Sequence, residues 1–272
     1  MRKKYLDQLP SWYKENGECD LVMSDDIDAL VSASLLKREK GWNVKYFYDF
    51  DNFYKSDIDS RHTRVWCDIA ILKNGERAFD NHVSRTDGSD LVNKNCINPN
   101  LLNDVTAMNY KRKYAGSTAL LIWSIYRIPL PKTEEGKMLL LCIDSAFKGY
   151  YTDRFKYMCK FYLRDMFGFD ELIDVLERHT AEDFYRIIDK YHLTRKIVVS
   201  TKGHLYTDLD LDTIGELLEL DLKLPDIQFN IAKELERKSG KIGIKRVKDL
   251  KQNIFTLAYI YSDKVVCSVI PA

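Results

Sequence analysis

The sequence lacks the features that mark disulfide scaffolds, secreted proteins and membrane proteins. Its six cysteines form no Cys-x-x-Cys pair and no zinc-type cluster, so we expect reduced, mostly buried thiols. No stretch approaches about 18 consecutive apolar residues, and the basic start of the chain has no apolar segment of the kind found in signal peptides. We therefore expect a soluble, cytoplasmic protein that does not bind membranes.

A strong overall charge is also missing. Lys and Arg number 42 against 41 Asp and Glu, which leaves a formal net charge of +1. No field of the whole protein therefore points to nucleic acid, and any surface that binds phosphate must be local. Hydrophobic residues make up 45% of the 272 residues, which is enough for a globular core.

The first half of the chain alternates short β-rich runs with helical stretches. We predict strands at 19–23, 43–50, 65–72 and 76–82, and helices at 27–40, 114–127 and 134–147. The run at 65–72 is apolar almost throughout, as in a strand that is covered on both faces. Residues 1–150 are thus predicted to form an α/β domain with a largely parallel sheet and flanking helices.

The second half is predicted to contain a helical connector and a small C-terminal α/β domain. Residues 151–194 are rich in helix-forming, aromatic and charged residues and form the connector. Residues 195–272 contain strand-like runs at 195–200, 253–262 and 264–272, with helices near 211–220 and 226–239. The short turn at Ser262 and Asp263 indicates that the last two strands pair antiparallel.

Three carboxylates follow the first predicted strand. Asp25, Asp26 and Asp28 lie where that strand ends and a helix begins, and their like charges repel one another. A hard divalent ion such as Mg²⁺ or Mn²⁺ would compensate them, because these ions prefer oxygen ligands. The alternative is that one aspartate caps the helix and the others are solvated.

Further acidic residues interrupt apolar segments. Asp68 lies inside VWCDIAIL and Asp144 inside MLLLCIDSAF, where an ionised carboxylate is costly to bury unless it is paired or binds metal. The triplet of Asp80, Asn81 and His82 closes another strand-like segment. Taken one at a time, Asp68 fits a strand-end turn or a salt bridge as well as it fits a metal ligand, Asp144 fits a helical salt bridge, and His82 fits a structural role.

The order of these segments resembles the DHH phosphoesterase superfamily, which includes RecJ-like exonucleases, oligoribonucleases, family II pyrophosphatases and exopolyphosphatases. Four segments carry the resemblance, in the family's order: VMSDDIDALVSASLL, WCDIAI, FDNHVSR and LCIDSAF. CINPNLL and YAGSTALLIW also resemble segments that follow the DHH signature in many members. The resemblance covers about residues 18–150.

The resemblance implies a metal site and a set of residues near the phosphate. The implied metal-binding residues are Asp26, Asp28, Asp68, Asp144 and Asn81. Asp80, His82 and Arg85 are the implied catalytic residues; for Arg85, a solvated loop charge is the alternative. Two positions where the family usually has histidine ligands hold Val22 and Asn81 here, so the set favours one Mn²⁺ or Mg²⁺ ion rather than two.

Two functions follow from these residues. The first is a metal-dependent phosphoesterase that hydrolyses phosphodiesters of nucleotides or short single-stranded nucleic acid. The alternative is a catalytically lapsed DHH fold that binds nucleic acid, a nucleotide or a protein partner. Either function is compatible with a homodimer. The GGGH-type substrate loop of nuclease members is absent, and the basic segments 237–251 and 111–113 are candidate phosphate-binding regions or solvated charge.

Overall fold

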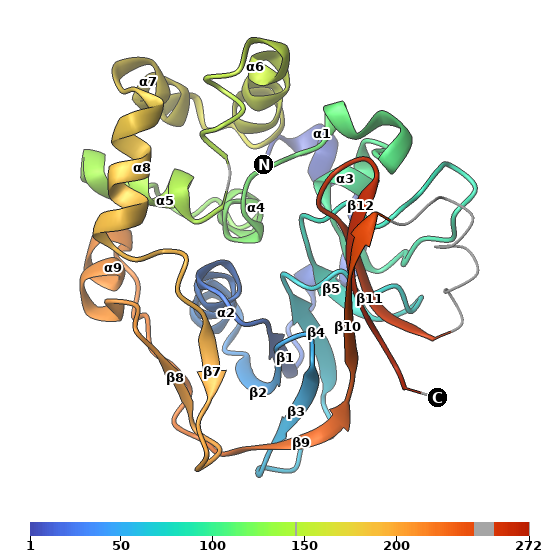
Figure 1. Ribbon diagram of the computed structural model, residues 1–272. Helices are drawn as coiled ribbons and strands as arrows, with labels where there is room; N and C mark the ends of the chain where they lie inside the picture. The colour runs from blue at the N-terminus through green and yellow to red at the C-terminus, as the bar shows by residue number, and fades with distance from the viewer. Residues whose placement is uncertain (145, 242–252, 272) are drawn as a thin grey trace.

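A mostly parallel sheet forms the centre of the computed structural model, which describes residues 1–144, 146–241 and 253–271 (Figure 1). Within these residues the sheet has seven strands, in the order β6-β5-β4-β1-β2-β3-β9. They are β1 (Cys19–Met23), β2 (Asn43–Tyr48), β3 (Asn52–Ser56), β4 (Thr63–Cys67), β5 (Arg77–Phe79), β6 (Cys96–Ile97) and β9 (Phe229–Glu234). The five strands from β6 to β2 pair parallel, whereas β3 and β9 pair antiparallel. The predicted α/β class with a largely parallel sheet is confirmed.

Helices cover one face of this sheet. Helix α2 (Ile27–Lys40) contacts β1, β2 and β4, and α4 (Thr118–Ile125) packs on α2 and β5. Leu21, Met23 and Phe79, from that face of the strands, share one hydrophobic core with these helices. The buried apolar side chains provide the main stabilisation of the packing.

The boundaries of α2 follow from local signals. Asp26 caps its first turn by accepting a hydrogen bond from the Ala29 amide, and Gly41 ends it in the left-handed conformation at φ 73°. The last turn carries Lys37, Arg38 and Lys40, which interact favourably with the helix dipole. The helix therefore begins and ends where the sequence predicts.

A helical layer continues from these elements. It contains α5 (Glu134–Cys142), α6 (Asp153–Lys160) with a π-helical turn at Phe161–Met166, α7 (Asp170–Arg178), α8 (Ala181–Lys190) and α9 (Leu211–Leu218). Helix α5 packs against α7, α8 and α9, and Figure 1 shows these four helices along one side of the molecule. The predicted helical region after residue 150 is confirmed.

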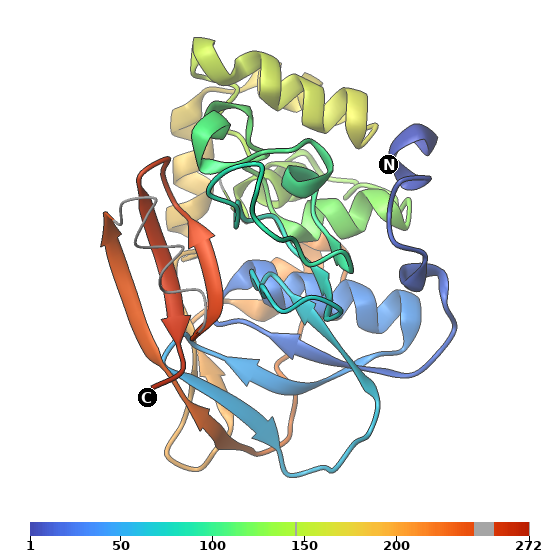
Figure 2. The same ribbon diagram turned by 90° about the vertical axis from the view of Figure 1, so that its right-hand side faces the viewer.

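A small antiparallel sheet covers the other face of the central sheet (Figure 2). Its strands are β10 (Glu236–Lys241), β12 (Lys264–Val269) and β11 (Ile254–Tyr259), in that order. Phe255 of β11 packs on Trp66 and Phe53, with ring centroids 5.7 Å apart in both pairs. The Tyr48 hydroxyl lies 2.5 Å from the Thr256 hydroxyl, which ties the two sheets together.

The structure corrects several predicted elements. The helix predicted at 226–239 is wrong, because these residues form β9 and β10, which pair with β3 and β12. The strand predicted at 65–72 ends at Cys67, since Asp68 has a φ of 58° and turns the chain out of the sheet. The helix predicted at 134–147 ends at Cys142, and the one at 114–127 begins only at Thr118. The antiparallel pairing of the last two strands is confirmed.

Shorter elements complete the described chain. They are α1 (Lys3–Leu6), 3₁₀ turns at Ser11–Lys14 and Ala107–Arg112, α3 (Pro99–Leu102) and the hairpin of β7 (Ile197–Val199) with β8 (Leu205–Thr207). All six cysteines are free. Among the described residues, no helix is both long enough and apolar enough to cross a membrane. Residues 242–251 of the basic segment 237–251 lie outside the described part of the chain.

Candidate metal centre

The carboxyl ends of four neighbouring parallel strands carry polar side chains, several of which are predicted site residues. Asp25 and Asp26 follow β1, Asp68 follows β4, Asp80 to His82 follow β5, and Asn98 follows β6. In open α/β sheets, ligands bind in the crevice at this edge. The topology therefore gathers side chains that are far apart in the sequence.

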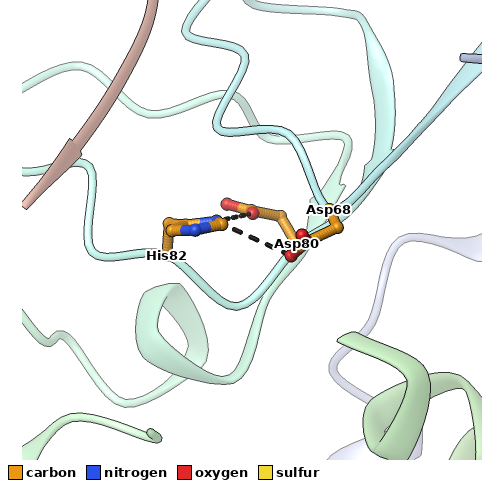
Figure 3. Close-up of side chains that lie close together, drawn as sticks. All are labelled: Asp68, Asp80 and His82. Atoms are coloured by element: carbon orange, nitrogen blue, oxygen red, sulfur yellow. Dashed lines mark hydrogen bonds and ion pairs between the residues drawn. The ribbon is translucent and has the colours of Figure 1, made fainter. Parts of the chain in front are cut away.

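Asp68, Asp80 and His82 form a close group. Nδ1 of His82 lies 2.7 Å from Oδ1 of Asp80 and 3.8 Å from Oδ1 of Asp68. Dashed lines mark these two contacts in Figure 3. One ligand atom of each residue lies within 4.8 Å of the other two. Asp80 is 1% exposed and Asp68 8%, while the His82 side chain is 34% exposed. The group is thus buried on the carboxylate side and open on the imidazole side.

The protonation of this group reflects crowded negative charge. Burial, followed by the charges of the nearby Asp26, Asp80 and Asp144 carboxylates, raises the pKa of Asp68 to about 8, although His82 opposes the rise. Burial opposes charge on His82, but Asp80, Asp68 and Asp144 outweigh it and raise the pKa of His82 to about 10. Burial, followed by the Asp68, Asp26 and Asp144 charges, likewise raises the pKa of Asp28 well above its ordinary value. The crowded carboxylates of this region therefore favour bound protons or a bound cation.

Asp28 and Asp68 are joined through the start of α4. The backbone amides of Thr118 and Ala119 each donate to the Asp28 carboxylate at 2.8 Å, and the Ser32 hydroxyl donates to it at 3.3 Å. The Thr118 hydroxyl donates to Oδ1 of Asp68 at 2.9 Å. A carboxylate at a helix N-terminus is favourable because the free amides and the helix dipole both attract it. Thr118 therefore fixes the relative position of the two aspartates.

Asp26 lies at the same edge but is engaged differently. Its Oδ1 accepts the capping hydrogen bond from Ala29, and its Oδ2 lies 3.3 Å from Nζ of Lys196. Nζ of Lys196 also lies 2.9 Å from Oδ1 of the buried Asp25. The interpretation of one aspartate as a helix cap thus holds for Asp26, while its role as a metal ligand stays a prediction.

Asn81 and Asp144 meet on the other side of the group. Nδ2 of Asn81 donates to the Gly116 carbonyl at 2.7 Å and to Oδ2 of Asp144 at 3.1 Å. The amide nitrogen of Asn81, rather than its oxygen, therefore faces Asp144. Asp144 is exposed and follows the end of α5.

Arg85 is held by neighbouring loops. Its Nη1 donates to Asp104 at 3.1 Å and its Nη2 to the Gly88 carbonyl at 3.0 Å. The side chain is only 10% exposed, so it is not a solvated loop charge. Its contact with a phosphate stays a prediction.

A basic cleft of about 900 Å³ adjoins the carboxylates. It is lined by the turn at 107–116, by residues of and before α6, and by the tip of the β11–β12 hairpin. The basic lining residues are Lys111, Arg112, Lys113, Lys148 and Arg154, and no described lining residue is acidic. Gly116, which accepts the Asn81 hydrogen bond, lines the cleft as well, so this residue touches both regions.

Aromatic rings are interspersed among these charges. Tyr110, Phe155 and Tyr261 line the cleft, and Tyr261 is 63% exposed. Rings of this kind beside cationic groups offer stacking surfaces for bases of single-stranded nucleic acid.

Sequence reasoning missed three residues of this region. Thr118 was detectable in part, because Ser117 and Thr118 precede an apolar run and mark a helix N-terminus, which attracts carboxylates. Lys196 and Asn98 carry no local signal, since their contacts to Asp25 and Asp80 depend on the folded chain.

No family profile, curated protein or solved structure matches this chain.

Proposed function

We propose that this chain is a divalent-metal-dependent phosphoesterase of the DHH type, which hydrolyses phosphodiesters of nucleotides or short single-stranded nucleic acid. The observation that carries the proposal is the group of Asp68, Asp80 and His82 at the carboxyl edge of the sheet, with ligand atoms within 4.8 Å of one another. The resemblance of the sequence motifs supports the same function. We also propose a cytoplasmic location, consistent with the free thiols of all six cysteines.

The residues present fit a hard divalent ion. Two carboxylates and one imidazole suit Mn²⁺ better than Mg²⁺, which prefers oxygen ligands alone. The raised pKa of Asp68, caused by burial and by neighbouring carboxylates, supports a cation here, because a positive ion would relieve the repulsion. When bound, such an ion would activate water and offset charge on a phosphate.

The surrounding residues would position this group. The Thr118 hydroxyl holds Asp68, and Nδ2 of Asn98 donates to Oδ2 of Asp80 at 3.0 Å. Hydrogen bonds of this kind fix the orientation of ligating side chains. His82 is the most exposed member of the group and so lies on the side from which a substrate would approach.

The adjacent cleft supports a polyanionic substrate. Its five basic residues create local positive charge on a chain whose net charge is only +1. Lysine and arginine would hold successive phosphates, and the rings of Tyr110 and Tyr261 would stack on bases.

The rival function is a binding module without catalysis. The specific observation in its favour is that Asp28 already accepts two backbone hydrogen bonds at 2.8 Å, and that Asn81 acts as a donor. These residues are held in place without any ion. Under this function the cleft would bind nucleic acid that is never cleaved.

One experiment separates the two functions. Release of mononucleotides from a labelled short oligonucleotide is measured with Mn²⁺ for the wild type and for Asp68→Asn and Asp80→Asn. Asp174→Asn, on the exposed surface of α7, is the matched control. We expect hydrolysis by the wild type and the control and a loss of about 10²-fold or more in the two site variants. Oligonucleotide binding without hydrolysis in every protein would favour the rival.

A further inference from the structure

Lys196 places a positive charge among the carboxylates that follow β1. Its Nζ lies 2.9 Å from Oδ1 of Asp25 and 3.3 Å from Oδ2 of Asp26. The Asp25 side chain is 11% exposed, whereas that of Lys196 is 51% exposed. The ammonium thus neutralises a buried acid and still reaches solvent at the edge where the site opens.

The backbone holds Lys196 at this place. The amide of Ile197, the first residue of β7, donates to the Asp25 carbonyl at 2.8 Å. The Thr207 hydroxyl, from the paired strand β8, donates to the Lys196 carbonyl at 3.0 Å. The start of β7 is therefore anchored to the end of β1, and the ammonium is directed at the two aspartates.

The same region is poorly equipped for a second metal ion. Val22 of β1 is fully buried in one apolar cluster with Tyr48 and Trp66, so it offers no ligand. Both oxygens of Asp26 are engaged, one by the Ala29 amide and the other by Lys196. A divalent ion bound to Asp26 would have to displace the Lys196 ammonium or lie close to it. Two positive charges only a few ångströms apart repel each other, which costs free energy.

We propose that Lys196 takes the place of a second cation, so that the centre binds one divalent ion at Asp68, Asp80 and His82 and has a fixed ammonium on its Asp25–Asp26 side. This inference rests on the proposed metal-dependent function. The half-exposed ammonium can donate to a phosphate oxygen as a compact point charge. It would thus share the neutralisation of the substrate with the ion.

The test is the number of Mn²⁺ ions bound per chain, measured by equilibrium dialysis with metal analysis. Wild type, Lys196→Met and Lys196→Arg are compared, with Lys202→Met in the exposed β7–β8 turn as the control. Methionine keeps most of the length of the side chain but removes its charge. We expect about one ion for the wild type, Lys196→Arg and Lys202→Met, and about two for Lys196→Met.

The outcomes separate this inference from the proposed function. If folded Lys196→Met still binds one ion with unchanged affinity, Lys196 is only a structural tether and the inference is overturned, while the metal centre stands. If no protein binds Mn²⁺, both proposals fail. Should Lys196→Met not fold, electron paramagnetic resonance of the wild type with saturating Mn²⁺ decides: an isolated ion supports the inference, and a spin-coupled pair about 3.5–4 Å apart overturns it.

Discussion

Replacing Thr118 with valine tests whether the Asp68 carboxylate is a metal ligand. Thr118 is fully buried, and its hydroxyl donates to Oδ1 of Asp68 at 2.9 Å while its amide donates to Asp28. Valine keeps the shape and the backbone amide but removes the hydroxyl. The change therefore acts on Asp68 and leaves the capping of α4 by Ser117 in place.

The expected loss in the free energy of unfolding follows from this single hydrogen bond. Removing one partner of a buried hydrogen bond leaves the other partner unsatisfied, which costs about 1–3 kcal/mol. We expect the free energy of unfolding to fall by that amount, which lowers Tm by roughly 3–10 °C for a chain of this size. Because residues that orient ligands influence metal binding strongly, the Mn²⁺ affinity should fall about 10–100-fold.

Isothermal titration with Mn²⁺ and thermal unfolding measure the two effects. Thr118→Ser is the control, since it keeps the hydroxyl and loses only a methyl group, at a cost of about 1 kcal/mol. It should retain the wild-type Mn²⁺ affinity. If Thr118→Val is destabilised but binds Mn²⁺ as tightly as Thr118→Ser, the hydrogen bond has only a structural role and Asp68 is not a ligand that Thr118 orients.

Three further outcomes are expected. Asp68 has an ordinary pKa of 3.8 and a folded-state pKa of about 8, so between these values the folded metal-free protein keeps a proton that the unfolded chain loses. The stability of the metal-free protein should therefore fall between about pH 4 and pH 8. Thermal scans should also show that the rise in Tm on adding Mn²⁺ grows with pH over that range. Arg112→Glu in the cleft should weaken oligonucleotide binding in EDTA and reduce the dependence of log K on log salt by about 0.7, whereas Lys202→Glu should change neither, as fluorescence anisotropy would show. Phe255→Ala removes a ring that packs on Trp66 and should lower the free energy of unfolding by about 2–3 kcal/mol in urea denaturation; a loss under about 0.5 kcal/mol would mean that the small sheet adds little to the core.

Local signals in the sequence were sufficient for much of the central sheet. The helix that starts after Asp26 and ends at Gly41 was predictable, because a capping carboxylate and a glycine in the left-handed conformation mark its limits. The strands β1 and β4 were predictable from their apolar runs. The exit of the chain at Asp68 was not, since a non-glycine residue with a φ of 58° has no reliable sequence signal.

The largest error concerns residues 226–239. This segment contains Ala, Leu, Glu, Lys and Arg, which favour a helix when propensity alone is considered. In the fold, β9 completes the edge of the central sheet beside β3, and β10 pairs with β12. Long-range strand pairing overrides local propensity here, and a single sequence does not reveal the partners.

For the site, the sequence identified the acidic residues but not how they are held. Asp68 was a candidate because it interrupts an apolar strand, and Asp80 and His82 were candidates because they close a strand-like segment that resembles the DHH signature. Their mutual contacts depend on the pairing of β4 with β5, and the bond from Thr118 to Asp68 depends on where the start of α4 lies in the folded chain. The ion pair of Lys196 with Asp25 joins residues 171 positions apart and has no local pattern.

The metal centre is tested most directly by measuring Mn²⁺ binding to the purified protein with titration calorimetry at fixed pH. We expect saturable binding and a rise in Tm for the wild type, and the loss of both in Asp80→Asn, whose carboxylate lies 2.7 Å from His82. A wild-type protein that neither binds Mn²⁺ nor gains thermal stability from it would contradict the metal centre.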